Sequence, residues 1–450
     1  MTRSIAILTP TMQIHQVGLP RIVLINHPTN HGTSGQLYTY PIKSLRGIAV
    51  PDARLTCTGF EYDRRFMLLK VVEGDDGVDT LKNMHVPHFP EMALFTTDIV
   101  FPSADGKRDG KVIARHHPPG VHDNDDPRVR TFEIPLTPDV KGLEQLDILM
   151  HSSPTKGYNM GSAYNDWFSS CFGYRVVLAY LGPHSRRVLG SFPPGKSAAH
   201  RESAPPLVST RSLAVLAGVT LALNLVGLSV SSWADAAAWP NLAATAGAVL
   251  LSSLVSRYVS SQGGKRKEEK ITFADVAPYM LVSEASVDDL SGRFQGDVQM
   301  DVTKFRPNIV VSGVEKPFEE DFWAELSVGD GPARLLLTAN CIRCSSINVD
   351  YDTGKMGTGE AGTALKKLMK DRRVDRGAKW NPVFGRYTFL DPGSENMRIH
   401  RGDAVTVMRR AAEREICGEY SIIYTADMMG LTCLQIGREW RSLSPRRWIE

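Results

Sequence analysis

Residues 333–350, ARLLLTANCIRCSSINVD, combine two features that decide how this chain is interpreted: strand patterns and a pair of cysteines. The apolar run before Cys341 and the stretch SSINVD after Cys344 are both typical of strands, which places C-I-R-C in the turn between them. A thioredoxin-like pair is expected between a strand and a helix, and a zinc half-site needs a second Cys or His pair nearby, so both are disfavoured. Buried thiols without a chemical role remain an open alternative.

Arg343 lies between the two cysteines. A nearby cation lowers the pKa of a thiol and makes the thiol a better metal ligand. A thiolate is a soft ligand, which suits a transition metal better than magnesium or calcium. The turn is therefore a candidate metal site.

Other turns carry compact sets of hydrogen-bond donors. These sets are Lys43-Ser44, Arg64-Arg65, and Arg306 with Asn308. Arginine forks and a lysine–serine pair are what a ligand bearing phosphate and amide groups requires. Each set alone is more often a solvated surface feature, so the prediction of one binding site depends on their meeting in space.

The composition fits a folded protein of two or three domains. The 450 residues are 42% hydrophobic and 22% charged, which excludes a wholly disordered chain. A net charge of +3 gives no support for nucleic-acid binding. The six cysteines are scattered, unlike the disulfide framework of a small secreted domain, so a reducing compartment is expected.

Strand patterns dominate much of the chain. Short apolar runs such as RRFMLLKVVE (64–73) predict strands. Helices are expected at residues 165–172, 284–294 and 361–373. The Gly- and Pro-rich stretch 103–126 predicts an exposed loop, and WAEL (323–326) is helix-like.

The combined motifs resemble those of MOSC-domain proteins. YPIKSLRG (40–47) and DRRFMLL (63–69) are similar to the N-terminal β-barrel of that family. The segments that resemble the MOSC domain itself are FADVAPYMLVSEAS (273–286), FRPNIVVSG (305–313), FWAELSVGD (322–330), CIRCSSINVDYDTG (341–354), NPVFGRYTFL (381–390) and IHRGDAVTV (399–407). Their order and spacing are similar to those of the mitochondrial amidoxime-reducing components, over about residues 37–181 and 271–407.

This resemblance implies an α+β fold rich in β-barrel structure. An N-terminal MOSC-type β-barrel would precede a C-terminal MOSC β-barrel with short helices, with an apolar helical hairpin inserted between them. The expected segments are an N-terminal extension (1–36), the N-terminal β-barrel (37–181), a linker (182–270) containing the hairpin (213–255), the MOSC domain (271–408) and a C-terminal tail (409–450).

The resemblance also implies a molybdenum–molybdopterin cofactor, with Cys344 as both metal ligand and catalytic residue. By the same matching, the residues that would hold the pterin and its phosphate are Lys43, Ser44, Arg65, Ala277 (through its main chain), Arg306, Asn308 and Arg343. Cys341 is expected only to support the turn. The sequence departs from the family at Ile342, where the reductases often have a small polar residue, which puts one hydrogen bond in doubt.

The activity implied by the resemblance is two-electron removal of oxygen from small N-hydroxylated substrates, giving the amine or amidine and water. The implied electron donors are a b-type cytochrome and its NADH-dependent flavin reductase. Two alternatives stay open: a molybdenum reductase of nitrite or a sulfoxide, and a non-catalytic cofactor or sulfur-carrier module. MOSC domains also end the cofactor sulfurases, but no pyridoxal-phosphate domain accompanies this one, so a complete sulfurase is not expected.

The insertion predicts attachment to a membrane. Residues 213–233 reach the length of about 20 apolar residues that a spanning helix needs, and residues 239–255 are near the lower limit. Trp233 and Trp239 fall where an interfacial aromatic belt would lie, and basic residues flank both ends. The catalytic domain would then face the cytosol, and analogy favours the outer mitochondrial membrane. A buried helical hairpin in a soluble domain is the alternative.

Two further segments resemble known signals only in part. GSFPPGKS (190–197) fits the P-loop pattern, yet Pro193 and Pro194 supply no backbone N–H groups for phosphate, so an NTPase is not expected. The first residues have too short an apolar run for a signal peptide. They contain Arg3 and Arg21 and no acidic residue before Asp52, so an organelle transit peptide stays an open alternative, although Pro10 and Pro20 would interrupt its helix.

Overall fold

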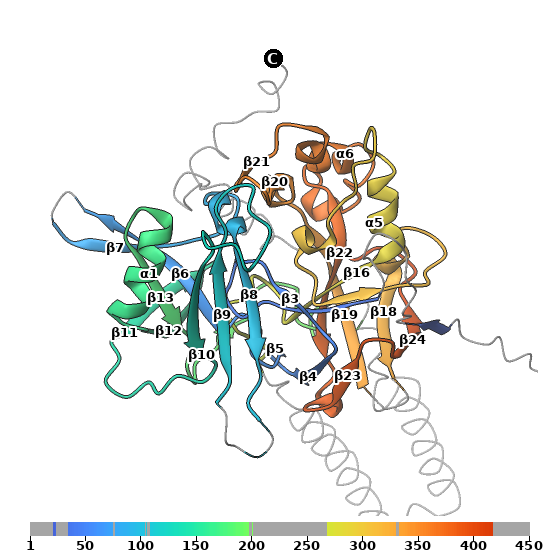
Figure 1. The fold of residues 1–450 in the computed structure, drawn as a ribbon. Helices are drawn as coiled ribbons and strands as arrows, with labels where there is room; N and C mark the ends of the chain where they lie inside the picture. Colours follow the sequence, from blue (N-terminus) through green and yellow to red (C-terminus); the bar gives the residue numbers. More distant parts are fainter. Residues whose placement is uncertain are drawn as a thin grey trace, which may run out of the picture.

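The computed structural model describes residues 21–23, 35–74, 77–103, 105, 109–197, 200, 268–329 and 333–416. Within these ranges the protein is mainly β-structure with few helices, as Figure 1 shows. The predicted hairpin at 213–255 and most of the two terminal segments lie outside the described residues. None of the described helices is both long and apolar enough to cross a bilayer.

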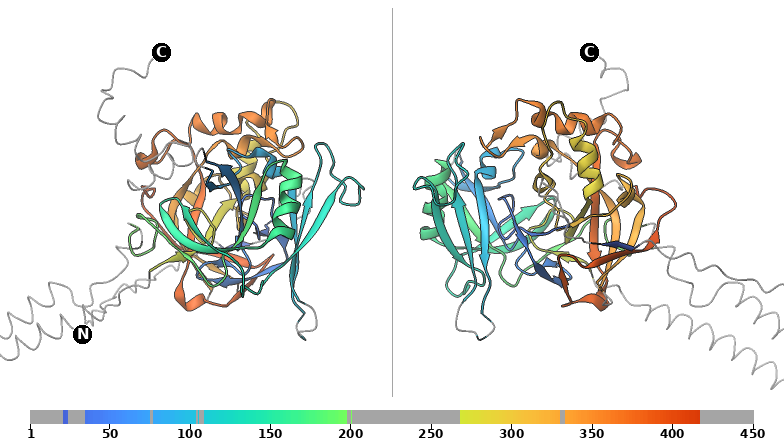
Figure 2. Two further views of the ribbon diagram at one scale, coloured as in Figure 1. Left: turned by 90° about the vertical axis from the view of Figure 1, so that its left-hand side faces the viewer. Right: turned by 45° about the vertical axis from the view of Figure 1, so that its right-hand side comes forward.

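The N-terminal half forms two antiparallel sheets that curve around one apolar core, in the barrel-like arrangement seen in Figure 2. The five-stranded sheet has the order β11 (Gln145–Met150), β12 (Ser153–Asn159), β13 (Val176–Tyr180), β6 (Phe66–Glu73) and β7 (Asp79–Asn83). The three-stranded sheet has the order β10 (Arg130–Pro135), β9 (Lys111–His116) and β8 (Phe95–Val100). Helix α1 (Ser162–Phe172) packs against β13 and ends at Gly173, whose left-handed φ of 78° suits glycine.

The C-terminal half is built on a nine-stranded sheet. Its order is β1 (Arg21–Val23), β24 (Ala404–Arg410), β18 (Trp323–Val328), β19 (Ala333–Ile342), β22 (Val383–Leu390), β16 (Tyr279–Ser283), β17 (Ile309–Val311), β2 (Leu37–Thr39) and β3 (Ile48–Val50). All eight residues of β22 are buried, because this strand lies at the centre of the sheet with apolar layers on both faces.

The two halves share this sheet. Strands β2 and β3 precede the N-terminal sheets in the chain, yet β2 pairs with β17. In the same way β4 (Asp52–Thr56) pairs with β23 (Arg398–His400) and with β5 (Gly59–Phe60). The turn between β2 and β3, which carries Lys43, is therefore held at the junction of the halves.

Shorter elements complete the fold. Two small ladders join β14 (Arg186–Arg187) to β15 (Lys270–Ile271) and β20 (Val349–Asp350) to β21 (Lys355–Met356). Within the described residues the remaining helices are α5 (Glu284–Ser291) and α6 (Ala364–Met369), with 3-10 turns η1 (Pro90–Leu94), η2 (Val302–Phe305), η3 (Glu319–Phe322), η4 (Ser345–Asn348), η5 (Glu360–Thr363), η6 (Arg376–Ala378) and η7 (Pro392–Ser394).

Three local predictions were wrong. The helix-like WAEL belongs to strand β18, because pairing with β19 and β24 outweighs its local preference. The stretch 103–126, expected as a loop, contains β9 at the centre of its sheet. The predicted strand after Cys344 is instead the 3-10 turn η4 followed by the short β20. The helices expected near 165–172, 284–294 and 361–373 are confirmed as α1, α5 and α6, the last two shorter than predicted.

Candidate functional site

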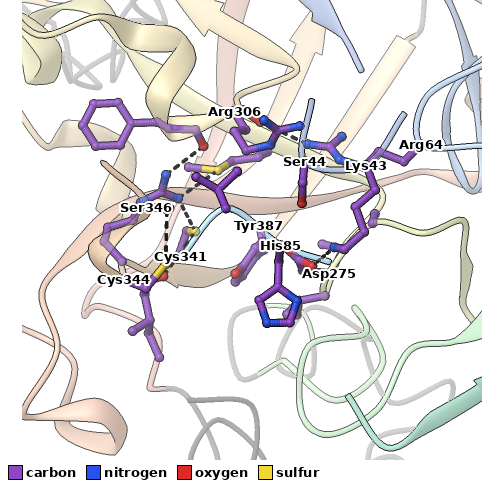
Figure 3. Close-up of a pocket in the computed structure, with 18 of the residues that line it drawn as sticks. Lys43, Ser44, Arg64, His85, Asp275, Arg306, Cys341, Cys344, Ser346 and Tyr387 are labelled. Carbon is purple, nitrogen blue, oxygen red and sulfur yellow. Dashed lines mark hydrogen bonds and ion pairs between the residues drawn. The ribbon is translucent and has the colours of Figure 1, made fainter. Parts of the chain in front are cut away.

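An open cavity lies where the turn after β2 meets the loops after β7 and β15 and the end of β19 (Figure 3). Its charged lining consists of five cationic side chains and one carboxylate: Lys43, Arg64, Lys304, Arg306, Arg343 and Asp275. This excess of positive charge favours an anionic ligand.

Cys344 lies at the end of the long strand β19, on the side of the cavity opposite Lys43 in Figure 3. Its Sγ lies 3.2 Å from the Oγ of Ser346, the second residue of η4. Burial raises the pKa of the Cys344 thiol, although the Ser346 hydrogen bond and the charge of Arg343 act in the opposite direction. A bound metal cation would favour the thiolate and reverse the effect of burial.

Arg343 makes its direct contacts with the other cysteine. The guanidinium donates to Cys341 Sγ at 2.7 Å and to the Phe305 carbonyl oxygen at 2.8 Å. Its Nε is buried and has no hydrogen-bond partner within the described ranges. An unsatisfied buried donor costs free energy, so this N–H is one that a bound ligand could pair with. Arg343 therefore supports the cysteine turn through its hydrogen bond to Cys341, and its Nε–H is the donor that a ligand in the cavity could use.

Lys43 and Asp275 form an ion pair across the cavity floor. Lys43 is 4% exposed, and burial lowers the pKa of its ammonium group. Burial opposes ionisation of Asp275, but the charge of Lys43 and a contact with His151 hold the pKa of this carboxyl well below its usual value. His151 Nε2 lies 3.3 Å from Asp275 Oδ1. The three groups form a continuous chain of polar contacts.

Two arginines stack on the same aromatic ring. The Tyr40 ring centroid lies 4.8 Å from Arg64 Cζ and 4.6 Å from Arg306 Cζ. Arg306 donates to the Leu45 carbonyl oxygen at 2.7 Å. Arg64 pairs with Asp63, which is fully buried. Tyr40 thus packs against both guanidinium groups, and both arginines line the cavity, where they could bind a phosphate or carboxylate.

Asn308 lies under these arginines and is fully buried. Its Oδ1 accepts from Arg64 at 3.1 Å and from the Met280 backbone N–H at 3.2 Å. Its Nδ2 donates to the Tyr38 carbonyl oxygen at 3.2 Å. Three of the four hydrogen-bonding positions of this amide are therefore used within the protein.

Three residues of the cavity lining have left-handed backbones without being glycine. The φ angles of Ser44, Arg64 and Arg306 are 69°, 51° and 56°. Such conformations cost free energy in most residues and cluster at functional sites, where the surrounding structure enforces them. Their concentration around one cavity supports a binding function for it.

The structure brings most of the residues singled out from the sequence into this one cavity. Those that line it are Lys43, Ser44, Ala277, Arg306, Asn308, Arg343 and Cys344. Arg65 does not: its guanidinium donates to the Gly182 carbonyl oxygen and stacks near Tyr180. Arg64 lines the cavity in its place.

Sequence reasoning missed several residues of the lining. Lys304, His85, Asp275, Ser346 and Tyr387 all line the cavity. A single Asp or His in a loop belongs to no recognisable sequence motif, so only the folded structure shows that these side chains line the cavity. Lys304 and Ser346 lie within two residues of Arg306 and Cys344, which is the one hint that the sequence contained.

Two protein families match the chain. The MOSC N-terminal beta barrel domain matches residues 32–175 and the MOSC domain matches residues 268–406. Mitochondrial amidoxime-reducing component 1 of Mus musculus is 33% identical over 84% of this chain and 82% of its own length. The Homo sapiens component 1 is 36% identical over 32% of this chain, a match that spans 40% of that relative. The molybdenum cofactor sulfurase of Emericella nidulans is 32% identical over 30% of this chain and 18% of its own length.

Proposed function

Because the chain belongs to the MOSC-domain family of the mitochondrial amidoxime-reducing components, we propose that it is a molybdenum-cofactor-dependent reductase of small N-hydroxylated compounds. The observation that carries the proposal is the meeting of the Cys344 thiol with Lys43, Arg64 and Arg306 in one cavity. A soft ligand and a set of anion-binding donors are the two requirements of a metal held by a phosphate-bearing pterin.

The residues present fit such a cofactor. Five cationic groups face one carboxylate in the lining, so an anionic ligand would relieve an excess of buried positive charge. The unpaired Nε of Arg343 and the hydroxyl of Ser44 are donors available to it. The left-handed backbones of Ser44, Arg64 and Arg306 are the kind of strain that a binding site retains.

Each side chain then has a defined task. Arg64, Arg306, Lys43 and Ser44 would bind the pterin and its phosphate, with a main-chain contact from Ala277. The Cys344 thiolate would ligate the metal, while Ser346 orients its Sγ and Arg343 braces the turn. When bound, the cofactor supplies the two-electron redox chemistry, and the protein supplies orientation, charge and access.

The remaining parts of the proposal concern electron supply and location. We propose that the electrons come from a b-type cytochrome and its NADH-dependent flavin reductase. We also propose that the protein is attached to a membrane with the catalytic unit facing the cytosol, at the mitochondrial outer membrane. The word mitochondrial in the names of the relatives supports this location, and the apolar insertion of the sequence supports the attachment.

A second candidate is a module that carries sulfur or the cofactor without turnover. The similarity to a molybdenum cofactor sulfurase favours it, since a cysteine in a cationic pocket could hold a persulfide instead of a metal. Reduction of nitrite or a sulfoxide would use the same cofactor with another substrate.

Metal analysis beside a turnover assay separates these candidates. The full-length protein should contain stoichiometric molybdenum and reduce an aromatic amidoxime when supplied with NADH and the two donor proteins. Cys344→Ser should fold normally and lose this reduction, whereas the matched control Cys341→Ala should retain most of it. Full activity in Cys344→Ser would refute the proposed metal ligand. Sulfur bound at Cys344 without molybdenum would favour the carrier.

A further inference from the structure

Reduction of an N-hydroxylated compound consumes protons as well as electrons. The N–O bond breaks, two electrons arrive from the one-electron haem donor by way of the cofactor, one proton is added to nitrogen, and a second proton leaves with the hydroxyl group as water. Each turnover therefore needs two protons at the cavity, whose lining includes the buried Lys43 and the 43% exposed side chain of Asp275. A side chain of the lining that can give a proton and be recharged by its polar neighbours would supply them.

Several titratable groups of the cavity cannot do so. Arginine keeps its protons at any physiological pH. The Tyr279 hydroxyl donates to the Thr56 carbonyl oxygen at 2.6 Å, and burial raises the pKa of this phenol well above its usual value. Burial lowers the pKa of His85 to about 4, so near neutral pH its imidazole has no additional proton to give. Lys43 can donate, because burial lowers the pKa of its ammonium group, but it must then be recharged.

The contacts around Lys43 provide a path for that recharging. Lys43 pairs with Asp275 Oδ1, and the same oxygen lies 3.3 Å from His151 Nε2. Imidazole is the side chain that most readily gains and loses a proton near neutral pH. The path from His151 to Lys43 thus contains only groups in direct polar contact.

This path connects two cavities. Asp275 lines the cofactor cavity and also a second, smaller cavity, which His151 lines as well. His151 and Asp275 therefore form part of the wall between them.

The wall is held rigidly by Arg186. This residue is 1% exposed, and its guanidinium donates to the Met150 carbonyl oxygen at 2.7 Å and to the Asp275 carbonyl oxygen at 3.1 Å. It thereby ties the backbone of Asp275 to the residue preceding His151. His151 and Ser152 form the tight turn between β11 and β12, with φ angles of 51° and 61° that fit a type I′ hairpin.

We propose that His151 and Asp275 form the proton-entry route of the active site and recharge Lys43 from the second cavity. The inference rests on the proposed reductase function. His151 is on this view a positioning and proton-supply residue that touches neither substrate nor cofactor. The charged and titratable groups that surround it on neighbouring segments are Lys43, His85, Arg186, Arg187 and Asp275.

The test is His151→Asn in the full-length, cofactor-loaded protein. Asparagine tolerates the left-handed backbone at this position and carries an amide that does not titrate. We expect kcat to fall by about tenfold or more, with unchanged KM and molybdenum content, a larger solvent deuterium isotope effect, and recovery on addition of free imidazole. The matched control His184→Asn, whose imidazole contacts Tyr158 and Gln145 outside the cavity, should behave as wild type.

A second measurement does not depend on turnover. In the full-length protein with 15N-labelled histidine, Asp275→Asn should move the Nε2 resonance of His151, because this nitrogen lies 3.3 Å from Asp275 Oδ1. An unchanged His151 resonance, or wild-type kcat and isotope effect in His151→Asn, would overturn the route while leaving the reductase proposal intact. Absence of amidoxime reduction by the wild type would instead refute the reductase function, and the route with it.

Discussion

Replacement of Asn308 by alanine tests whether this residue is chiefly a ligand contact or chiefly a support for the site. Its amide makes three hydrogen bonds inside the protein, to Arg64, the Met280 N–H and the Tyr38 carbonyl oxygen. At about 1 kcal/mol for each bond, their loss alone removes about 3 kcal/mol. The Met280 N–H is then left buried without this partner, which raises the expected destabilisation to about 3–5 kcal/mol.

The assay is urea denaturation of the cofactor-free protein, followed by tryptophan fluorescence. Trp323, one of the seven tryptophans of the chain, is fully buried in the nine-stranded sheet, so part of the emission change reports on the half of the protein that contains Asn308. The exposed Asn124 provides the control, since Asn124→Ala should leave the denaturation midpoint unchanged. If Asn308→Ala destabilised only the cofactor-loaded protein, the assignment of Asn308 as a support for Arg64 would be refuted.

Two further predictions concern the charged groups of the cavity. Arg64→Ala should lower the molybdenum content of the purified protein, whereas Arg65→Ala should leave it near wild type, because only the first guanidinium lines the cavity; equal losses in both variants would contradict this placement. The pKa of Asp275 is depressed in the folded state, so its contribution to stability is present above the ordinary aspartate value of about 4 and is lost as the pH falls from there toward the lower folded-state pKa. Asp275→Asn should therefore flatten the dependence of the urea midpoint on pH between about 5 and 3, and parallel curves for variant and wild type would count against the ion pair.

The choice between Arg64 and Arg65 illustrates where sequence reasoning failed. Arg64 lies in the turn before β6 with a left-handed backbone, and Arg65 is the last residue before the strand begins, so the two side chains leave the chain in different directions. Which one lines the cavity depends on the register of β6, which pairs with β13 from Phe66 onward. That register is set by strands distant in the chain, so the residues next to Arg64 in the sequence do not predict it.

The contact between His151 and Asp275, the two residues of the proposed proton route, also could not be predicted from the sequence. His151 and Asp275 are 124 residues apart, and each stands alone in its loop. Their contact arises because Arg186, from a third segment, binds the backbone of both loops. No local spacing could have predicted it.

The sequence by itself determined the features that depend on neighbouring residues: the turn that presents Cys344 at the end of a strand, the Lys43-Ser44 pair, and the amphipathic patterns of most strands and helices. These follow from local backbone preferences and from the periodicity of apolar residues. Tertiary structure alone decided which donors face the cavity and which groups meet there, because β2, β15 and β19 are brought together by long-range pairing and burial. Side-chain direction and charge coupling are properties of that packing, and they exist only once the chain has folded.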